Sequence, residues 1–421
     1  MAIHVLTDGI VIPSLNSSQY VSQTVESVFD ATSRHLEVFF MDGRSVDGTY
    51  DKSLMNFSLS PLDKSKFNIV SQADSGAAQA INSGFRQCKF VDVIGWLNSD
   101  DLYAPGAIDR ALKLFESNPK LKIVYGLGRH IDATGKDLGA YPTLPPSVSI
   151  KQFADGSFIC QPTVFFRREV FDEVGLLDES LKTAFDLDLW LRIFKRYRKN
   201  QIGFINRVQA YSRLHDQCLT KRLRQTVALE SMQVISKHLG SAPGHWILTY
   251  FDELCERYPF IEEKESLLEI IKDVLQKAKA FMKAADFATL VKTLQSDARL
   301  KLANDQAFVD VQPDGWVSKK LIAKLRYKKG EKRTLILKCQ GGWPKEANIH
   351  LSIRSATGEI EKIKLGSQDE FTLTLEAPET NTEAFTAWVI ETRQFFVPAN
   401  VQKRSKDTRK LSFRVDSLSV R

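Results

Sequence analysis

The first half of the chain alternates between short apolar runs and amphipathic segments. Apolar runs of strand length recur at residues 9–13, 36–41, 67–70, 91–97 and 123–125. Between them, apolar residues follow the 3.6-residue period of a helix in segments 21–29, 76–86 and 108–115. Alternating strands and helices favour a parallel sheet with helices on both faces. The pattern therefore predicts an α/β domain built on a mainly parallel, Rossmann-like sheet.

The pattern changes twice further along the chain. Between residues 126 and 162, Gly, Pro and Ser interrupt it, which indicates a long loop or a small hairpin. A strand at 163–166, a helix opening at Asp186 and extended structure at 206–214 follow. Residues 220–305 read as helix, and alternation with a period of two begins beyond Trp316. We expect an α/β domain at 1–219, a helical linker at 220–305 and a β-sandwich at 306–421.

Composition is typical of a soluble globular protein, because 43% of the 421 residues are hydrophobic and 26% are charged. The five cysteines are scattered and show no metal-ligand spacing, so neither a disulfide framework nor a zinc site is expected. No apolar stretch is long enough to span a bilayer, and the first residues lack the features of a signal peptide. A cytoplasmic location is the expectation.

The formal net charge of +7 suits an anionic ligand or an acidic surface. It is too small to indicate nucleic acid as a partner, and we expect none. Peripheral contact with the inner face of the membrane is compatible with this charge. Self-association through the helical or β-rich part is left open by the sequence.

The segment from Asn98 to Asp101 carries the strongest chemical signal. An apolar run ends there in two adjacent carboxylates, and ligands of open α/β sheets bind beyond the carboxyl ends of strands. Adjacent carboxylates repel each other unless a cation lies nearby, and Mg²⁺ or Mn²⁺ usually accompanies a phosphate-bearing substrate. The alternative is a helix N-cap, because a helix starts shortly after Pro105.

Six motifs in this order resemble those of family 2 glycosyltransferases with the GT-A fold, over roughly residues 9–218. They are 11–16 (VIPSLN), 40–49 (FMDGRSVDGT), 74–84 (DSGAAQAINSG), 97–101 (LNSDD), 185–192 (FDLDLWLR) and 211–215 (YSRLH). Three further segments are similar to an accessory module found on bacterial glycosyltransferases: 313–316 (PDGW), 396–399 (FVPA) and 407–413 (DTRKLSF).

The resemblance implies a set of contacts to a nucleotide-sugar donor. The residues are Pro13, Ser14, Asn16, Asp42, Asp74, Gln79, Asn82, Asn98, Ser99 and Arg213. Asp42 would accept the imide N–H of uracil, which favours a UDP-sugar, although Asp-Gly is also a good turn former. Asp100 would ligate Mn²⁺ or Mg²⁺ at the diphosphate. His215 is either a second metal ligand or an ordinary surface histidine.

Asp186 matches the acidic residue that acts as general base in the family. It would take the proton from an attacking hydroxyl, and a single displacement inverts the anomeric carbon. A helix N-cap is the alternative for this residue. Three positions depart from the family pattern: Asn98 replaces an Asp, Ile81 an Arg, and Phe185 a Glu. Asn98 leaves the strictness of metal dependence open.

These observations predict an inverting glycosyltransferase of the hexosyltransferase type. The expected acceptor is a glycan or a lipid-linked glycan precursor in bacterial surface polysaccharide synthesis. One alternative is a non-catalytic sugar-binding or scaffold protein with a decayed transferase domain. The other is a sugar-phosphate nucleotidyltransferase, which usually has a Gly-rich basic loop after the first strand. Residues 13–17 contain no such loop.

Overall fold

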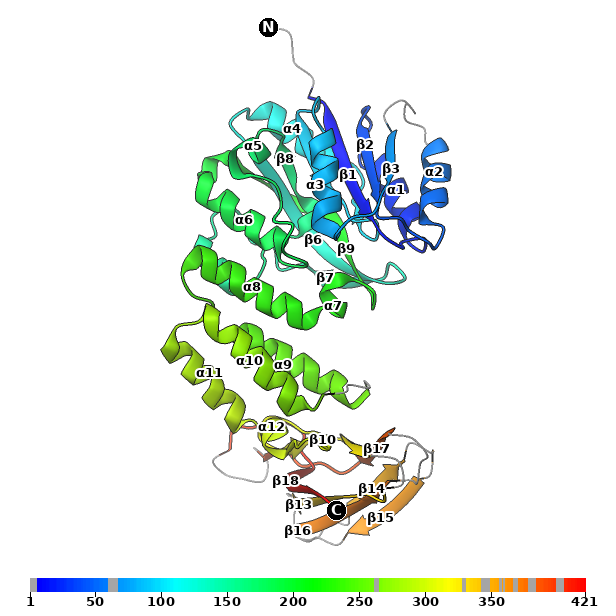
Figure 1. Cartoon of the computed structure of the whole chain (residues 1–421), viewed down its shortest axis with the longest axis vertical. Helices are drawn as coiled ribbons and strands as arrows, with labels where there is room; N and C mark the ends of the chain where they lie inside the picture. Colours follow the sequence, from blue (N-terminus) through cyan, green and yellow to red (C-terminus); the bar gives the residue numbers. More distant parts are fainter. Residues whose placement is uncertain are drawn as a thin grey trace. The chain divides into compact units, whose positions relative to one another are not determined.

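The computed structural model divides into two compact units, Met1–Pro243 and Gly244–Arg421 (Figure 1). The described residues are 6–59, 67–260, 265–327, 331–341, 349–355, 358, 360–365, 370–377, 384–398 and 405–421. Ala399, the last residue of one motif of the predicted accessory module, lies outside them. The predicted boundaries at residues 219 and 305 stay predictions.

The first unit is built on a nine-stranded sheet in the order β3-β2-β1-β4-β8-β6-β9-β5, with β7 paired to β6. The strands are β1 (Asp8–Ser14), β2 (Glu37–Asp42), β3 (Phe67–Ser71), β4 (Val93–Trp96), β5 (Leu102–Tyr103), β6 (Ile123–Asp132), β7 (Asp137–Ala140), β8 (Phe165–Arg167) and β9 (Ile202–Leu214). Strands β3, β2, β1 and β4 are parallel, whereas β8 runs antiparallel to β4 and β6. The α/β class is confirmed, and the sheet is mixed beyond β4.

Helices cover both faces of this sheet (Figure 1). They are α1 (Val21–Asp30), α2 (Thr49–Ser58), α3 (Ala77–Gln87), α4 (Ala107–Ser117), α5 (Val170–Val174), α6 (Phe185–Arg196), α7 (Leu219–Arg222) and α8 (Arg224–Leu239), with 3₁₀ turns η2 (Ile150–Ala154), η3 (Gln161–Thr163) and η4 (Lys199–Gln201). The alternation of side chains along β8 shows the two layers. Phe165 packs in the core formed with α1 and α4, whereas Phe166 stacks on Trp190 of α6.

The parallel strands end at one edge of the sheet, and their register sets which side chains meet there. Ser14 at the end of β1 pairs with Asp42 at the end of β2, which pairs in turn with Ser71 at the end of β3. On the other side of β1, Val11 pairs with Trp96, the last residue of β4. The polar segment after β4 therefore continues the same edge.

The second unit begins with helices and ends in two facing sheets. Its helical elements are α9 (His245–Arg257), η5 (Tyr258–Phe260), α10 (Leu267–Ala278), η6 (Lys279–Phe281), α11 (Ala284–Ser296) and α12 (Ala298–Leu302). One sheet has the order β10-β12-β17-β14-β15 and the other β11-β18-β13-β16. The strands are β10 (Ala307–Asp310), β11 (Trp316–Val317), β12 (Lys320–Tyr327), β13 (Thr334–Gly341), β14 (Ile349–Arg354), β15 (Ile360–Leu365), β16 (Glu370–Glu376), β17 (Ala384–Thr392) and β18 (Phe413–Val420).

The two sheets of this unit share one hydrophobic core. Leu321 and Trp388 enter it from the five-stranded sheet, and Leu335, Leu373 and Phe413 enter it from the four-stranded sheet. Their residues alternate with outward-facing polar ones, as in Glu370–Glu376. The predicted C-terminal β-sandwich is confirmed.

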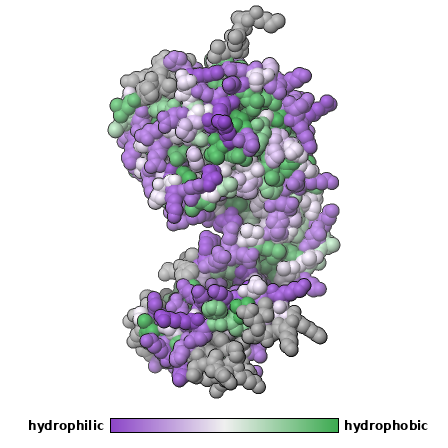
Figure 2. All heavy atoms as spheres, turned by 180° about the vertical axis from the view of Figure 1, so that it is seen from behind, coloured by the Kyte–Doolittle hydropathy of each residue, from purple (hydrophilic) through white to green (hydrophobic). Residues whose placement is uncertain are grey.

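Helices of the described residues do not combine the length and the apolarity that a membrane span requires. On the face drawn in Figure 2, hydrophilic residues are interspersed with smaller groups of hydrophobic ones. This mixture is ordinary for a protein surface, to which apolar atoms always contribute.

Helix α3 approaches β1 at Gly84, which gives a test of the packing beneath the site. A Cβ atom at residue 84 would lie 2.4 Å from Cγ1 of Val11. Gly84→Ala should therefore lower the free energy of unfolding by about 1–3 kcal/mol, because the helix must move away from the strand. Scanning calorimetry measures the change, with Ser83→Ala on the same helix as the control. An unchanged midpoint in Gly84→Ala would contradict the close contact.

Candidate active site

The first part of the site is a polar cluster of Ser14, Asp42 and Ser71, where β1, β2 and β3 end. Asp42 is 2% exposed, and its Oδ2 atom accepts hydrogen bonds from Ser71 Oγ at 2.5 Å and from the backbone N–H of Ser45 at 3.2 Å. The Ser14 hydroxyl lies buried with no hydrogen-bond partner in the described part of the chain. A buried hydroxyl without a partner is costly, and a ligand that bonds it would remove that cost.

Asp74 adds a second carboxylate to this polar cluster. A Cβ atom at residue 43 would lie only 2.8 Å from Asp74 Oδ2, so Gly43 leaves the space that this carboxylate uses. Burial raises the pKa of Asp74, the N–H of Gly76 opposes the rise, and the charge of Asp42 adds to it. Two neighbouring carboxylates make this end of the edge a strong acceptor of N–H or O–H groups.

Pro13 and Asn16 lie at the end of β1 and in the turn after it, beside the polar cluster. Pro13 is buried in β1, opposite Met41. Asn16 has a positive φ of 52°, its N–H donates to Ser45 Oγ at 2.8 Å, and its Oδ1 accepts from Val46 N at 3.0 Å. Asn16 thus ties the turn after β1 to the loop after β2.

Helix α3 contributes Gln79 and Asn82, which have different surroundings. Gln79 Oε1 accepts from Ser75 N at 2.6 Å in the first turn. Asn82 is buried, and its amide donates to Leu177 O at 3.0 Å and to Glu179 Oε1 at 2.8 Å while accepting from Leu177 N at 3.0 Å. Asn82 therefore orders the segment before α6, and the donor contacts expected of both residues stay predictions.

Asp100 and His215 face each other beyond the end of β4. His215 Nε2 and Asp100 Oδ2 are 2.9 Å apart, and the two side chains are 11% and 25% exposed. The ring of Tyr20 lies 4.8 Å from the imidazole. Within the ranges that the structure describes, no group of three or more His, Cys, Asp and Glu residues is arranged to hold a metal. A carboxylate and an imidazole fit a divalent cation whose other ligands are phosphate or water oxygens.

Asp101 is turned inward, away from its neighbour Asp100. Its Oδ1 accepts from Arg213 N at 2.8 Å, and its Oδ2 accepts from Asn98 Nδ2 at 3.2 Å. Burial, followed by the charge of Asp100, raises the pKa of Asp101 well above its ordinary value. The two adjacent carboxylates therefore have different surroundings, and Asp100 is the one that faces solvent.

Asn98 and Ser99 are anchored within the framework of the edge. Asn98 Oδ1 accepts from Trp96 Nε1 at 2.9 Å, and its Nδ2 also donates to Gln161 Oε1 at 3.2 Å. The Ser99 hydroxyl donates to Ser17 Oγ at 2.7 Å. These bonds fix the direction in which Asp100 leaves the strand.

Arg213 lies beneath Asp100 with 2% of its surface exposed. Its guanidinium donates to the backbone oxygen of Asp100 at 2.7 Å, to that of Asp132 at 3.2 Å and to Gln23 Oε1 at 2.9 Å. It also stacks over the Tyr20 ring at 4.8 Å. These contacts make Arg213 a support for the segment that carries Asp100, and its expected contact with the donor stays a prediction.

Asp186 lies half-buried in the first turn of α6. Its Oδ1 accepts from the N–H of Leu187 at 2.7 Å, and Ala184, rather than Asp186, occupies the N-cap position. Burial raises the pKa of Asp186 to about 6, although hydrogen bonds from the backbone of Leu187 and Asp186 oppose the rise. A carboxyl group with this pKa can accept a proton at neutral pH.

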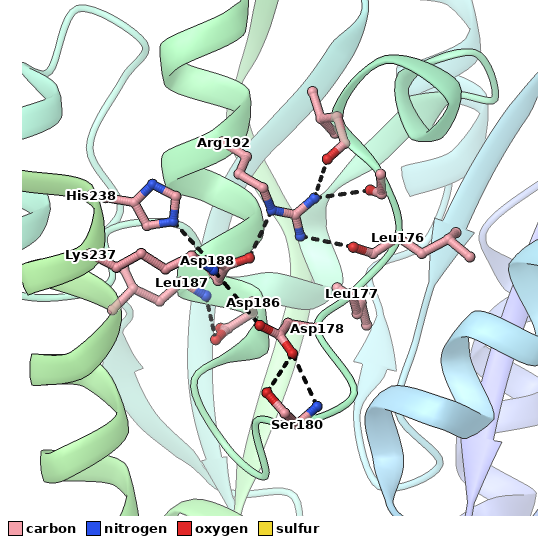
Figure 3. Close-up of polar contacts among 12 residues, drawn as sticks. Leu176, Leu177, Asp178, Ser180, Asp186, Leu187, Asp188, Arg192, Lys237 and His238 are labelled. Carbon is pink, nitrogen blue, oxygen red and sulfur yellow. Dashed lines mark hydrogen bonds and ion pairs between the residues drawn. The ribbon is translucent and has the colours of Figure 1, made fainter.

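Asp188, two positions after Asp186 in α6, has the opposite environment (Figure 3). It is 2% exposed and receives bonds from Arg192 Nε at 2.7 Å, His238 Nε2 at 2.8 Å and Lys237 Nζ at 3.1 Å. Burial alone would raise the pKa of Asp188, but the bonds from His238, Arg192 and Lys237 bring it below its ordinary value. These bonds give Asp188 a structural role, in which it joins α6 to α8.

Two contacts link Asp186 to the end of β4. The rings of Phe185 and Trp96 lie 5.8 Å apart. The buried thiol of Cys160 has its pKa raised by burial first and then by the charges of Asp101 and Asp186 together. The start of α6, which carries Asp186, therefore lies against the end of β4, from which the Asp100–Asp101 segment continues.

Several residues of this edge escaped sequence reasoning. Gln161 donates to Trp96 O at 2.7 Å and accepts from Asn98, so it joins the loop before β8 to β4. The pKa of the buried Cys160 thiol is raised in part by the charges of Asp101 and Asp186, and Tyr20 contacts both His215 and Arg213. Gln161 and Cys160 lie where the hydrophobic pattern was weak. The local signal there was the proline that follows Gln161, which is typical of the first turn of a helix.

Residues 9–175 match the model of the family described as glycosyl transferase family 2. A protein named uncharacterized glycosyltransferase from Rickettsia typhi is 30% identical over 216 residues, which are 49% of this chain and 64% of that protein. The chondroitin synthase of Escherichia coli is 28% identical over 185 residues, or 44% of this chain and 26% of that protein. Residues 9–175 of the first unit are therefore similar to glycosyl transferase family 2, the family that the sequence motifs resemble.

The chain spans 31%, 64% and 26% of the lengths of three matched relatives, from Rickettsia bellii, Rickettsia typhi and Escherichia coli. Among solved structures, it is similar to S. aureus TarS 1–349 in complex with UDP, with a TM-score of 0.44 and 13% identity over 68% of this chain and 86% of that one. The family match ends at residue 175, so Asp186 and His215 lie outside it.

The two acidic residues of α6 should affect stability in opposite ways. Because the folded-state pKa of Asp186 lies near 6, above its unfolded value, stability falls as pH rises from about 4 to 6. Asp186→Asn should thus stabilise the protein by about 1–2 kcal/mol above pH 7, with little effect near pH 4. Asp188→Asn should destabilise it by roughly 2–4 kcal/mol at pH 7, because Arg192, Lys237 and His238 lose the buried carboxylate that they share. Thermal unfolding of both variants at several pH values distinguishes them, and shifts of equal sign would contradict the two environments.

Proposed function

We propose that this protein transfers a sugar from a nucleotide-sugar donor, with a UDP-sugar favoured, to a hydroxyl group with inversion of the anomeric carbon. One observation carries the proposal. Asp186, a carboxyl group with a pKa of about 6, follows Phe185, whose ring contacts Trp96 at the end of β4. The Asp42 cluster and the Asp100–His215 pair lie where the neighbouring strands β2 and β4 end. A base, a nucleotide site and a diphosphate site are what the reaction requires.

The donor would lie along the edge of the sheet. The carboxylate of Asp42 suits the imide N–H of uracil, and the unpartnered Ser14 hydroxyl and Asp74 offer further contacts to the nucleoside. Asp100 and His215 would hold a divalent cation, Mn²⁺ or Mg²⁺, which supplies charge neutralisation at the departing diphosphate. Asn98, Ser99 and Arg213 fix the backbone that carries Asp100.

Asp186 would act on the acceptor. Its carboxylate takes the proton of the acceptor hydroxyl while the oxygen forms a bond to the anomeric carbon. The bond from that carbon to the diphosphate breaks at the same time, and the nucleoside diphosphate leaves with the electron pair. A pKa near 6 leaves most of Asp186 ionised at neutral pH while keeping it a stronger base than an exposed aspartate.

A glycan or a lipid-linked glycan is the proposed acceptor, in bacterial surface polysaccharide synthesis. Relatives named glycosyltransferase and chondroitin synthase, all from bacteria, support this class. Cytoplasmic location, contact with the inner face of the membrane and self-association stay predictions. A non-catalytic sugar-binding protein is the second candidate, because Asn98 contributes no charge to the diphosphate site.

Release of nucleoside diphosphate from a panel of UDP-glucose, UDP-galactose, UDP-N-acetylglucosamine and GDP-mannose tests the proposal. Wild type should release nucleotide from at least one donor, with a rate that rises with pH to half its maximum near pH 6. Asp186→Asn should lower the rate by roughly 10²–10⁴ while donor binding persists, because only proton transfer is lost. Equal rates for wild type and Asp186→Asn would refute the assignment of the base, and no release from any donor would favour the non-catalytic protein.

Metal removal tests the second carboxylate site. EDTA should lower nucleotide release at least roughly 10-fold, because the charge of the leaving diphosphate is then not neutralised. Mn²⁺ should restore the rate in wild type but not in Asp100→Asn. Asp172→Asn is the matched control, because Asp172 is exposed on α5 and paired with Arg168. Full activity of Asp100→Asn in EDTA would exclude the proposed cation site.

A further inference from the structure

We propose that Glu230 of α8 is a positioning residue that holds the general base Asp186 in place. This inference rests on the proposed function, because it assigns a role to a residue that acts through Asp186. It concerns a helix beyond the residues that match the family model, which end at 175.

Glu230 binds the backbone segment that leads into α6. The N-cap residue of α6 is Ala184, which has no side chain able to accept a hydrogen bond. Glu230 accepts instead from three successive backbone N–H groups, those of Lys182 at 2.9 Å, Thr183 at 2.7 Å and Ala184 at 3.1 Å. Its Oε2 also accepts from the Thr183 hydroxyl at 2.8 Å. The positive end of the dipole of α6 also stabilises a carboxylate at this place.

A second anchor from α8 holds α6 on the other side of Asp186. His238 and Lys237 bond the buried Asp188 at 2.8 and 3.1 Å (Figure 3). Lys237 lies seven positions and His238 eight positions after Glu230, which is about two turns along α8. Asp186 is therefore the middle one of the three residues, Phe185 to Leu187, that lie between the two points of attachment to α8.

This double attachment affects the chemistry of Asp186 because residues 182–184, which Glu230 binds, lead directly into it. Residues 182–184 end two positions before Asp186, and their backbone sets where its carboxylate starts. Burial is the main cause of the raised pKa of Asp186. A loosened segment would admit water, lower that pKa toward its ordinary value and misplace the base relative to the acceptor hydroxyl.

The experiment compares Glu230→Ala, Glu230→Gln and the matched control Gln233→Ala, an exposed residue of the same helix. The assay is nucleotide release between pH 5 and 9 from the UDP-sugar that wild type turns over. Glu230→Ala should lower kcat roughly 10- to 100-fold with KM for the donor within about twofold, and move the acid limb of the pH profile below pH 6. Glu230→Gln, which keeps one acceptor oxygen, should recover most of kcat, and Gln233→Ala should equal wild type.

Thr183→Val serves as a milder second variant, because it removes only the hydroxyl bond to Glu230. It should lower kcat a few-fold with the same direction of change in the pH profile, and it decides the question if Glu230→Ala does not fold. Wild-type kcat and an unmoved acid limb in the folded variants would overturn the proposal. Its failure differs from that of the proposed function, in which Asp186→Asn itself would match wild type.

Discussion

The contact between the rings of Phe185 and Trp96 connects the start of α6 to the end of β4, and the candidate site depends on it. Trp96 is the last residue of β4 and bonds Asn98, which directs Asp100 outward, whereas Phe185 immediately precedes Asp186. One apolar contact thus sets the separation between the proposed diphosphate site and the proposed base. Because aromatic pairs bury large areas, this link also supplies the apolar surroundings of the site.

The carboxylates of the candidate site differ in their hydrogen-bond partners. Asp42 is bonded by Ser71 and Ser45, and Asp101 by Asn98 and the Arg213 backbone. Asp188 is bonded by Arg192 of α6 and by Lys237 and His238 of α8. Asp186 receives only backbone N–H groups, so burial dominates its pKa. Carboxylates two positions apart on one helix therefore differ in the direction of their pKa shifts, and such separation marks residues suited to proton transfer.

The parts of this structure that sequence could predict are those with a local period. Strands β1 to β4 and helices α1, α3 and α4 follow from apolar spacing, and Asp42 and Asp100 could be expected at one edge because parallel strands end together. The antiparallel β8 and the bonds of Gln161 and Glu230 could not. Gln161 lies 63 residues from Asn98 and Glu230 lies 46 residues from Ala184, and no local pattern signals such pairs. The partners of Asn82, 95 and 97 residues away, were missed for the same reason.

Asn98 is one of three departures from the family pattern that leave a decayed domain as the alternative, and its contacts show what an asparagine does at this position. Its amide donates to Asp101 Oδ2 at 3.2 Å and to Gln161, while its oxygen accepts from Trp96. A carboxylate at this position could only accept, and it would face the buried carboxylate of Asp101 across the same short distance. The asparagine therefore donates to two acceptors, Asp101 and Gln161, that an aspartate could not satisfy, and it keeps the bond from Trp96. With Arg213 N on its other oxygen, the buried Asp101 is bonded on both oxygens, and Asp100 is the carboxylate of the pair that faces solvent.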